Sequence, residues 1–109
     1  MNFKVLSIPP FDKQLKRLVK KFPSLKGEFA QLLESLEVNP LHGTSLGNSC
    51  YKIRISIASK GKGKSGGARL ITNIIVEENT VFLISIYDKA EKDNLSNKEL
   101  LELLKQLPE

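Results

Sequence analysis

Apolar positions in the first forty residues recur mainly with the spacing of α-helices. Asn2 to Ile8 alternates and predicts a short strand, after which two prolines end the strand and open a helix. From Phe11 to Phe22 the apolar residues form one helical stripe. The stripe resumes from Leu25 to Leu36, where Ser24 is a candidate N-cap and Asn39-Pro40 ends the helix. Two helices joined by so short a break predict an αα-hairpin.

The spacing changes to a period of two in the second half of the chain. Pro40 to Ser49 is a loop by composition, and Tyr51 to Ile57 then alternates as a strand with one apolar and one basic face. Residues 59–67 are too rich in glycine for a regular element. Arg69 to Val76 and Val81 to Tyr87 are β-branched, mostly apolar runs separated by a four-residue turn, which predicts a hairpin.

A last helix follows from its start signal. Ser96-Asn97-Lys98-Glu99 fits a capping box, and the leucines between Leu100 and Leu107 give the helix an apolar side. The predicted order is therefore β-α-α-β-β-β-α, with three antiparallel strands and the helical hairpin over one face. We expect a single domain, residues 1–109, of the α+β class.

Composition limits the surroundings in which the chain would act. The first residues lack the apolar core of a signal peptide, and no apolar run reaches the roughly 18 residues that span a bilayer. Cys50 is the only cysteine, so an internal disulfide is impossible and a reducing cytoplasm is expected. One cysteine and one histidine do not make a zinc ligand set, so we expect neither metal nor other cofactor and no membrane partner.

The positive charge is concentrated in one segment. The formal net charge is +5, yet no Asp or Glu occurs between Val38 and Val76. The basic residues of that segment are Lys52, Arg54, Lys60, Lys62, Lys64 and Arg69. The segment carries +6, and the remainder, with 11 basic and 12 acidic residues, carries −1. A single-sign block favours a polyanionic partner, nucleic acid first, with a membrane surface, another anion or simple solubility as alternatives.

Several familiar catalytic sites are excluded. Gly63-Lys64-Ser65 resembles the end of a phosphate-binding P-loop, but position 58 is alanine and a β pattern follows where that motif needs a helix. His42, the only histidine, lies in an acid-free loop with no orienting partner in sequence. Paired carboxylates for acid–base work are missing from the basic segment.

A cationic surface remains as the candidate site. Lys52 and Arg54 leave the same face of their strand, Arg69 opens the next strand, and Lys89 follows the last strand just after Tyr87. Lys60, Lys62 and Lys64 alternate with glycines in the connecting loop. If the sheet closes as predicted, these groups meet on one concave surface, which would bind RNA phosphates and stabilise charge on a phosphorane. A basic patch that only binds, and a Tyr87 that only packs, are the alternatives.

Three stretches carry a resemblance to a known family. They read CYKIR, KGKGKSGGAR and FLISIYDKAEKDNLS, and together they resemble the RelE/HigB-like branch of the RelE/ParE toxin superfamily. The resemblance implies the β-α-α-β-β-β-α layout and an endoribonuclease that cleaves messenger RNA on the translating ribosome. It implies attack by the ribose 2′-hydroxyl without a metal, and a cognate antitoxin, expected to be of the helix-turn-helix type, as partner.

The resemblance also suggests roles for single residues. Lys52 is the candidate general base. Arg54, its neighbour, would act as the general acid or stabilise charge, and Arg69 would contact the scissile phosphate. Lys89 stands where relatives have a basic residue, and Lys60, Lys62 and Lys64 would hold the RNA backbone. The chain departs from some relatives because arginine is a poor proton donor at position 54. Leu95 or its neighbours also stand where some relatives stack a tyrosine on a base, so that role is vacant unless Tyr87 fills it.

Two other functions stay open at this point. One is a gyrase-poisoning toxin of the ParE type, which has the same fold without nuclease activity. The other is a non-catalytic RNA- or ribosome-binding relative. The basic set of Lys52, Arg54, Arg69 and Lys89 favours the nuclease. We further expect Arg69 at the solvent edge of the sheet, so that replacing it would leave the fold intact.

Overall fold

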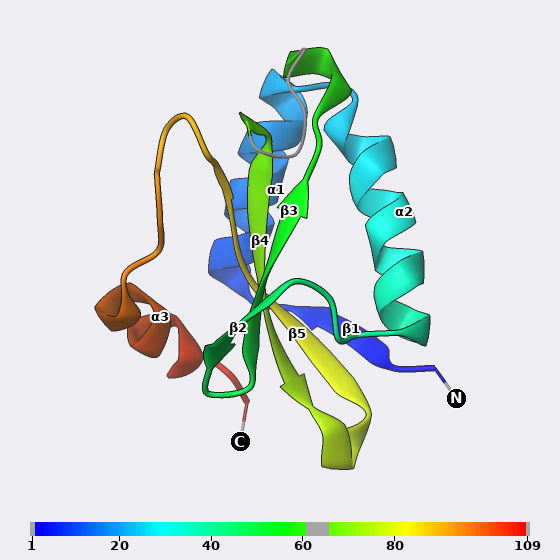
Figure 1. Ribbon diagram of the computed structural model, residues 1–109, viewed down its shortest axis with the longest axis vertical. Helices are drawn as coiled ribbons and strands as arrows, with labels where there is room; N and C mark the ends of the chain where they lie inside the picture. Colours follow the sequence, from blue (N-terminus) through cyan, green and yellow to red (C-terminus); the bar gives the residue numbers. More distant parts are fainter. Residues whose placement is uncertain (1, 61–65, 109) are drawn as a thin grey trace.

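The computed structural model describes residues 2–60 and 66–108, and a five-stranded sheet organises them (Figure 1). The strand order is β1-β5-β4-β3-β2. Strand β1 (Lys4–Ser7) runs parallel to β5 (Thr80–Asp88), and all other neighbours are antiparallel. Strands β4 (Ala68–Ile75) and β5 lie at the centre and are buried over almost their whole length. The predicted α+β class and element order are confirmed.

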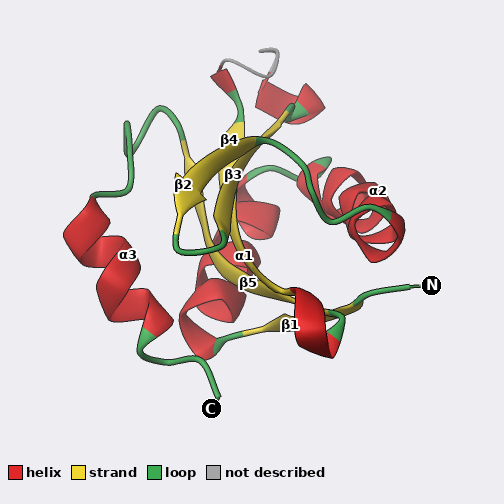
Figure 2. Ribbon diagram, turned by 60° about the horizontal axis from the view of Figure 1, so that its bottom comes forward, coloured by secondary structure: helices red, strands yellow, loops and turns green. Residues whose placement is uncertain are grey.

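The two N-terminal helices form the predicted hairpin. Helix α1 (Pro9–Lys21) begins at the proline pair, and α2 (Leu25–Val38) follows it (Figure 2). Ser24 was predicted to cap α2, but it has helical backbone angles and makes no side-chain cap bond. Its hydroxyl instead donates to the Glu28 carboxylate at 3.0 Å.

The predicted loop from residue 40 to 49 is wrong in its second half, because it contains strand β2 (Thr44–Gly47). Asn48 and Ser49 both have positive φ and make a tight turn into β3 (Cys50–Ile55). The Asn73 amide holds this turn by donating to the Asn48 carbonyl at 2.9 Å. A short edge strand without alternating apolar residues depends on its neighbour for pairing, so its pattern alone does not reveal it.

Strand β1 pairs only with the first part of β5, as far as Leu83. After Leu83 the side chain of Gln14, rather than a strand, bonds to this edge of β5. The Oε1 atom of Gln14 on α1 accepts hydrogen bonds from the backbone N–H of Ile86 at 2.9 Å and the hydroxyl of Ser85 at 3.1 Å. A backbone group that β1 is too short to reach is thereby satisfied. Helix α1 is consequently tied to the half of β5 that leads to the cationic residues.

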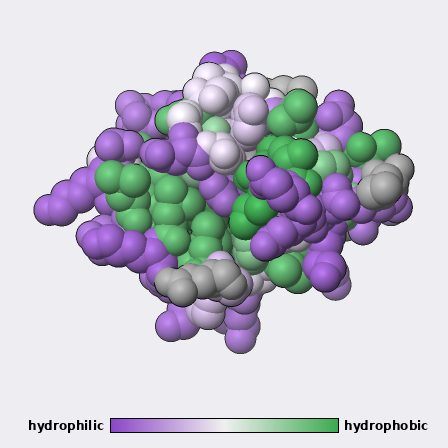
Figure 3. Space-filling view, turned by 90° about the horizontal axis from the view of Figure 1, so that it is seen from below, coloured by the Kyte–Doolittle hydropathy of each residue, from purple (hydrophilic) through white to green (hydrophobic). Residues whose placement is uncertain are grey.

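The last helix, α3 (Asn97–Leu104), carries the predicted capping box. The Ser96 hydroxyl accepts from the Glu99 backbone at 3.1 Å, and the Glu99 carboxylate accepts from the Ser96 backbone at 3.0 Å. Leu100 is buried and joins the core, together with half-buried Leu103 and Leu104. The large apolar side chains that stay exposed are Leu6, Val38, Leu41, Val76 and Leu101. Seen from below, the molecule shows apolar surface surrounded by hydrophilic residues (Figure 3).

We predict opposite stability effects for two glycine-to-alanine substitutions. Gly43 has a φ of +83°, and a Cβ there would lie 2.1 Å from the Lys52 carbonyl oxygen, so Gly43→Ala should destabilise the fold by at least about 1 kcal/mol. Gly27 lies in α2 with no atom within 4 Å of such a Cβ, so Gly27→Ala should stabilise by roughly 0.5–1 kcal/mol. Urea unfolding of both variants measures this, and equal signs would contradict the packing described.

Candidate nucleic-acid interface

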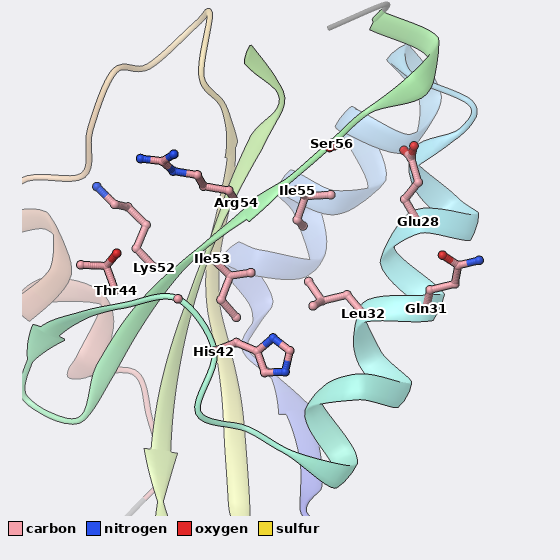
Figure 4. Close-up of a pocket in the computed structure, with 11 residues that line it drawn as sticks. Glu28, Gln31, Leu32, His42, Thr44, Lys52, Ile53, Arg54, Ile55 and Ser56 are labelled. Atoms are coloured by element: carbon pink, nitrogen blue, oxygen red, sulfur yellow. The ribbon is translucent and has the colours of Figure 1, made fainter. Parts of the chain in front are cut away.

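Three neighbouring strands bring the central cationic residues into one row. Arg54 on β3 is the register partner of Arg69 on β4, and Arg69 is the partner of Tyr87 on β5. Side chains of directly paired residues leave the same face of a sheet, so the three lie side by side. Lys52, two positions before Arg54, points to the same side, away from Ile53 and Ile55 (Figure 4). The predicted meeting of these residues therefore follows from the sheet register.

Arg69 is buried, which corrects the expectation that it would lie at the solvent edge. Only 5% of the residue is exposed, and its Nη1 donates to the Ala68 carbonyl at 3.1 Å. The reason is its strand, because β4 is the middle of the sheet and has Arg54 and Tyr87 on either side. The buried Arg69 side chain is therefore the centre of the row, flanked by the exposed Arg54 and the half-buried Lys52.

Lys89 is linked electrostatically to the row of Arg54 and Arg69 through Asp93, a residue that the sequence did not point to. Its ammonium forms an ion pair with the Asp93 carboxylate and donates to the Asp93 carbonyl at 3.0 Å. The pKa of Asp93 is lowered, first by the hydrogen bond from Lys89 and then by its charge, with smaller contributions from Lys52 and Arg69. Three of the four predicted catalytic cations therefore lower the pKa of the Asp93 carboxyl group. The sequence signal that could have revealed this pair is the spacing of the two residues, because the acidic Asp93 follows the basic Lys89 by four positions.

Lys60 lies elsewhere, in a buried ion pair. Its ammonium contacts the Asp88 carboxylate and stands 5.4 Å from the centre of the Phe22 ring, and the two charged side chains are 8% and 2% exposed. Asp88 follows Tyr87 on β5, so it points to the opposite, helix-covered face of the sheet. Lys60 is thereby held away from the cationic row. Lys62 and Lys64, the other two predicted RNA contacts of this loop, lie outside the described residues.

A further set of ion pairs ties α1 to the turn that carries Lys89. Arg17 contacts Glu91 at 2.7 Å and Lys21 contacts it at 3.2 Å, while Lys21 also lies 4.0 Å from Asp88. The hydrogen bonds from Arg17 and then from Lys21 lower the pKa of Glu91 to about 2. Helix α1 therefore anchors both Asp88 and the residues after it.

Tyr87 packs within the core cluster and is 6% exposed. Its hydroxyl has no hydrogen-bond partner among the described residues. Burial raises the pKa of the phenol, and the backbone near Leu95 together with the charges of Arg69 and Lys92 acts in the opposite direction. In this arrangement Tyr87 forms a wall between Arg69 and the region of α3 rather than an open stacking platform.

The residues that the structure describes hold no group of three or more His, Cys, Asp or Glu side chains placed to bind a metal ion. No described helix is both long and apolar enough to cross a membrane. Cys50 is buried, and burial raises the pKa of its thiol.

Comparison with known proteins agrees with the fold. The model of the RelE toxin of the RelE/RelB toxin–antitoxin system matches residues 12–108. This chain belongs to the RelE toxin family. A variant of the RelE toxin from Escherichia coli, solved in the free state, is similar with a TM-score of 0.65 and 19% identity, over 99% of this chain and 100% of that one.

Two further solved structures are similar to this RelE-family toxin. One is the toxin–antitoxin complex RelBE2 from Mycobacterium tuberculosis, with a TM-score of 0.57 and 19% identity over 83% of this chain and 94% of that one. The other is a metal-bound toxin from Helicobacter pylori, with a TM-score of 0.53 and 22% identity over 83% of this chain and 98% of that one. At these identities the likeness supports the shared fold.

We predict that Lys60→Met lowers stability much more than an exposed lysine substitution does. Removing Lys60 leaves the buried Asp88 carboxylate with the Ala90 backbone N–H at 3.0 Å and the more distant Lys21, so no close positive charge remains, which should cost roughly 2–3 kcal/mol. The matched control is Lys105→Met, whose pair with Glu102 is exposed and should cost under about 0.5 kcal/mol. Equal urea midpoints for the two variants would refute a structural role for Lys60.

The Glu91 pairs predict a pH dependence with a defined sign. The folded pKa of about 2 lies below the ordinary 4.5, so the pairs contribute stability above pH 4.5 and lose it as the pH falls from 4.5 toward 2. Because Glu91 is 39% exposed, we expect the loss to stay below about 1 kcal/mol. A carboxyl NMR titration should give a midpoint near 2, which Arg17→Gln moves toward 4.5. A midpoint already at 4.5 in the parent protein would rule out these pairs.

Proposed function

We propose that this RelE-family toxin is an endoribonuclease that cleaves messenger RNA without a metal, on the translating ribosome. The row formed by Arg54 and Arg69, with Lys52 beside it and Lys89 in the same electrostatic field, is the observation that carries the proposal. A phosphodiester that crosses this row meets cations from three separate segments of the chain. Positive charge fixed before the reaction is what stabilises the dianionic phosphorane at least cost.

Each residue then has a part in the reaction. Lys52 acts as the general base that takes the proton of the ribose 2′-hydroxyl, and the 2′-oxygen attacks the adjacent phosphorus. Arg69 holds the non-bridging oxygens, which gain charge as the new bond forms. The bond to the 5′-oxygen of the next nucleotide breaks, so the products end in a 2′,3′-cyclic phosphate and a 5′-hydroxyl. The leaving oxygen needs a proton, and the Lys89 ammonium is a better donor than the Arg54 guanidinium.

The partners follow from the family and from the charge. RelE-family toxins belong to toxin–antitoxin systems, and the similar Mycobacterium tuberculosis structure is a complex of both proteins. We therefore expect a cognate antitoxin, of the helix-turn-helix type, and action in the cytoplasm where messenger RNA is translated. Asp93 forms an ion pair with Lys89, so a substrate phosphate at Lys89 would replace a carboxylate there.

The test is to induce the gene and map RNA 5′ ends across translated messages. Cuts that repeat with the codon phase of ribosome-bound messages are the expected result. DNA damage without RNA cuts would assign the protein to gyrase poisoning instead. The absence of both, with RNA or ribosome binding retained, would leave a non-catalytic relative.

We predict that Arg54→Ala lowers cleavage by about 10²-fold or more without loss of stability, because the side chain is exposed and its charge acts on the transition state. Arg69→Gln should abolish cleavage, but the residue is buried, so its thermal midpoint must be measured alongside. The control is Lys26→Ala, an exposed cation on α2, which should cleave normally. Normal cleavage by Arg54→Ala in folded protein would contradict the proposed site.

A further inference from the structure

The turn that follows β5 carries Lys89 and is built on Asp88. The Asp88 backbone carbonyl accepts from the backbone N–H groups of Glu91 at 3.0 Å and Lys92 at 2.9 Å. The Asp88 carboxylate accepts from the backbone N–H of Ala90 at 3.0 Å. One residue thus bonds three consecutive N–H groups of the turn, from which the chain continues down to α3 (Figure 1). The conformation of the turn therefore depends on Asp88.

The Asp88 carboxylate is itself fixed from the helix-covered side of the sheet. Its side chain is 2% exposed, and the ammonium of Lys60 contacts the same Oδ1 atom that accepts from Ala90. Lys21 of α1 lies 4.0 Å from the other oxygen, Oδ2. A buried charge is stable only while it stays in contact with its partners, so this carboxylate keeps one position.

Lys89 is anchored to the sheet through its backbone. Its N–H donates to the Gly67 carbonyl at 3.0 Å, one residue beyond the last pair of β4 and β5, which is Ala68 with Asp88. The Lys89 ammonium is held by Asp93, whose side chain is 92% exposed. A substrate phosphate at Lys89 would replace that carboxylate. In the complex with RNA, the place of the ammonium would then depend on the backbone that carries it.

We propose that Asp88 is a positioning residue for cleavage, because it fixes the turn that places the Lys89 ammonium beside the leaving 5′-oxygen. This inference deepens the proposed function and rests on its assignment of Lys89 as the proton donor. As the bond from phosphorus to the 5′-oxygen breaks, the ammonium gives one proton to that oxygen and becomes a neutral amine. A misplacement of about 1 Å can slow a reaction roughly 10²-fold, so a loosened turn should slow this step.

Direct contact of Asp88 with RNA does not fit its place in the fold. Its side chain leaves the face of the sheet opposite to Tyr87 and Arg69, and it is covered there by Lys60 and α1. Its effect on the reaction must therefore pass through the turn. A role in stability alone is the alternative, and it is separated from positioning by a substrate that needs no proton donor.

The test replaces the leaving oxygen by sulfur. A thiolate leaves without a proton, so a message with a 5′-bridging sulfur at the cleavage position does not need the Lys89 ammonium. With the whole protein on translating ribosomes, Asp88→Asn, which keeps an acceptor for Ala90, should lower kcat at least about 10-fold for the oxygen message and less than about 3-fold for the sulfur message. Lys89→Met should show the same pattern with a larger loss. The matched control Glu102→Gln, an exposed acid on α3, should cleave both messages normally.

Two results would overturn the positioning role. One is an equal loss on both messages, because damage to folding or binding does not depend on the leaving atom. The other is a normal kcat of Asp88→Asn beside an impaired Lys89→Met. If the thermal midpoint shows that Asp88→Asn does not fold, Glu91→Gln replaces it, since exposed Glu91 ties the same turn to Arg17 and Lys21. Its loss should be about 3-fold and again confined to the oxygen message.

Failure of the proposed function gives a different pattern. A parent protein that cuts neither message refutes the nuclease. A Lys89→Met variant that cuts the oxygen message normally refutes the assignment of Lys89 as proton donor. In both cases the positioning role of Asp88 falls as well, whereas a defect of Lys89→Met that Asp88→Asn does not share removes the positioning role alone.

Discussion

The antiparallel register of β3, β4 and β5 is the constraint on which the candidate site depends. Because Arg54, Arg69 and Tyr87 are direct partners across these strands, one guanidinium is buried between a charged neighbour and an aromatic one. A shift of one residue on β4 would turn Arg69 toward the helices and remove the centre of the row. The apolar residues between these positions prevent such a shift, since it would expose Leu70 and other fully buried side chains. Core packing therefore sets the position of the charge.

Ion pairs on the other face of the sheet hold the segments at the end of β5. Asp88 points away from the cationic row and binds Lys60, while its neighbour in sequence, Lys89, binds Asp93 near the row. Arg17 and Lys21 of α1 then fix Glu91 in the turn between them. Lysines that cannot be distinguished in the sequence, such as Lys60 and Lys89, thus have two different roles. Some maintain the geometry, and others remain at the open face.

Much of the fold could be predicted from the sequence, because hydrophobic period is a local property. The helical stripes, the hairpin of β4 and β5, and the capping box at Ser96 all depend on residues close together in the chain. The motif around Lys52, Arg54 and Arg69 also indicated the family, and alternation put the first two on one face. The tertiary structure decided what depends on distant neighbours. It made β2 a strand by pairing, buried Arg69 in the central strand, gave Lys60 to Asp88, and brought Asp93 to Lys89. A charged side chain has the same sequence signature whether it is solvated, paired or functional, and only packing distinguishes the three.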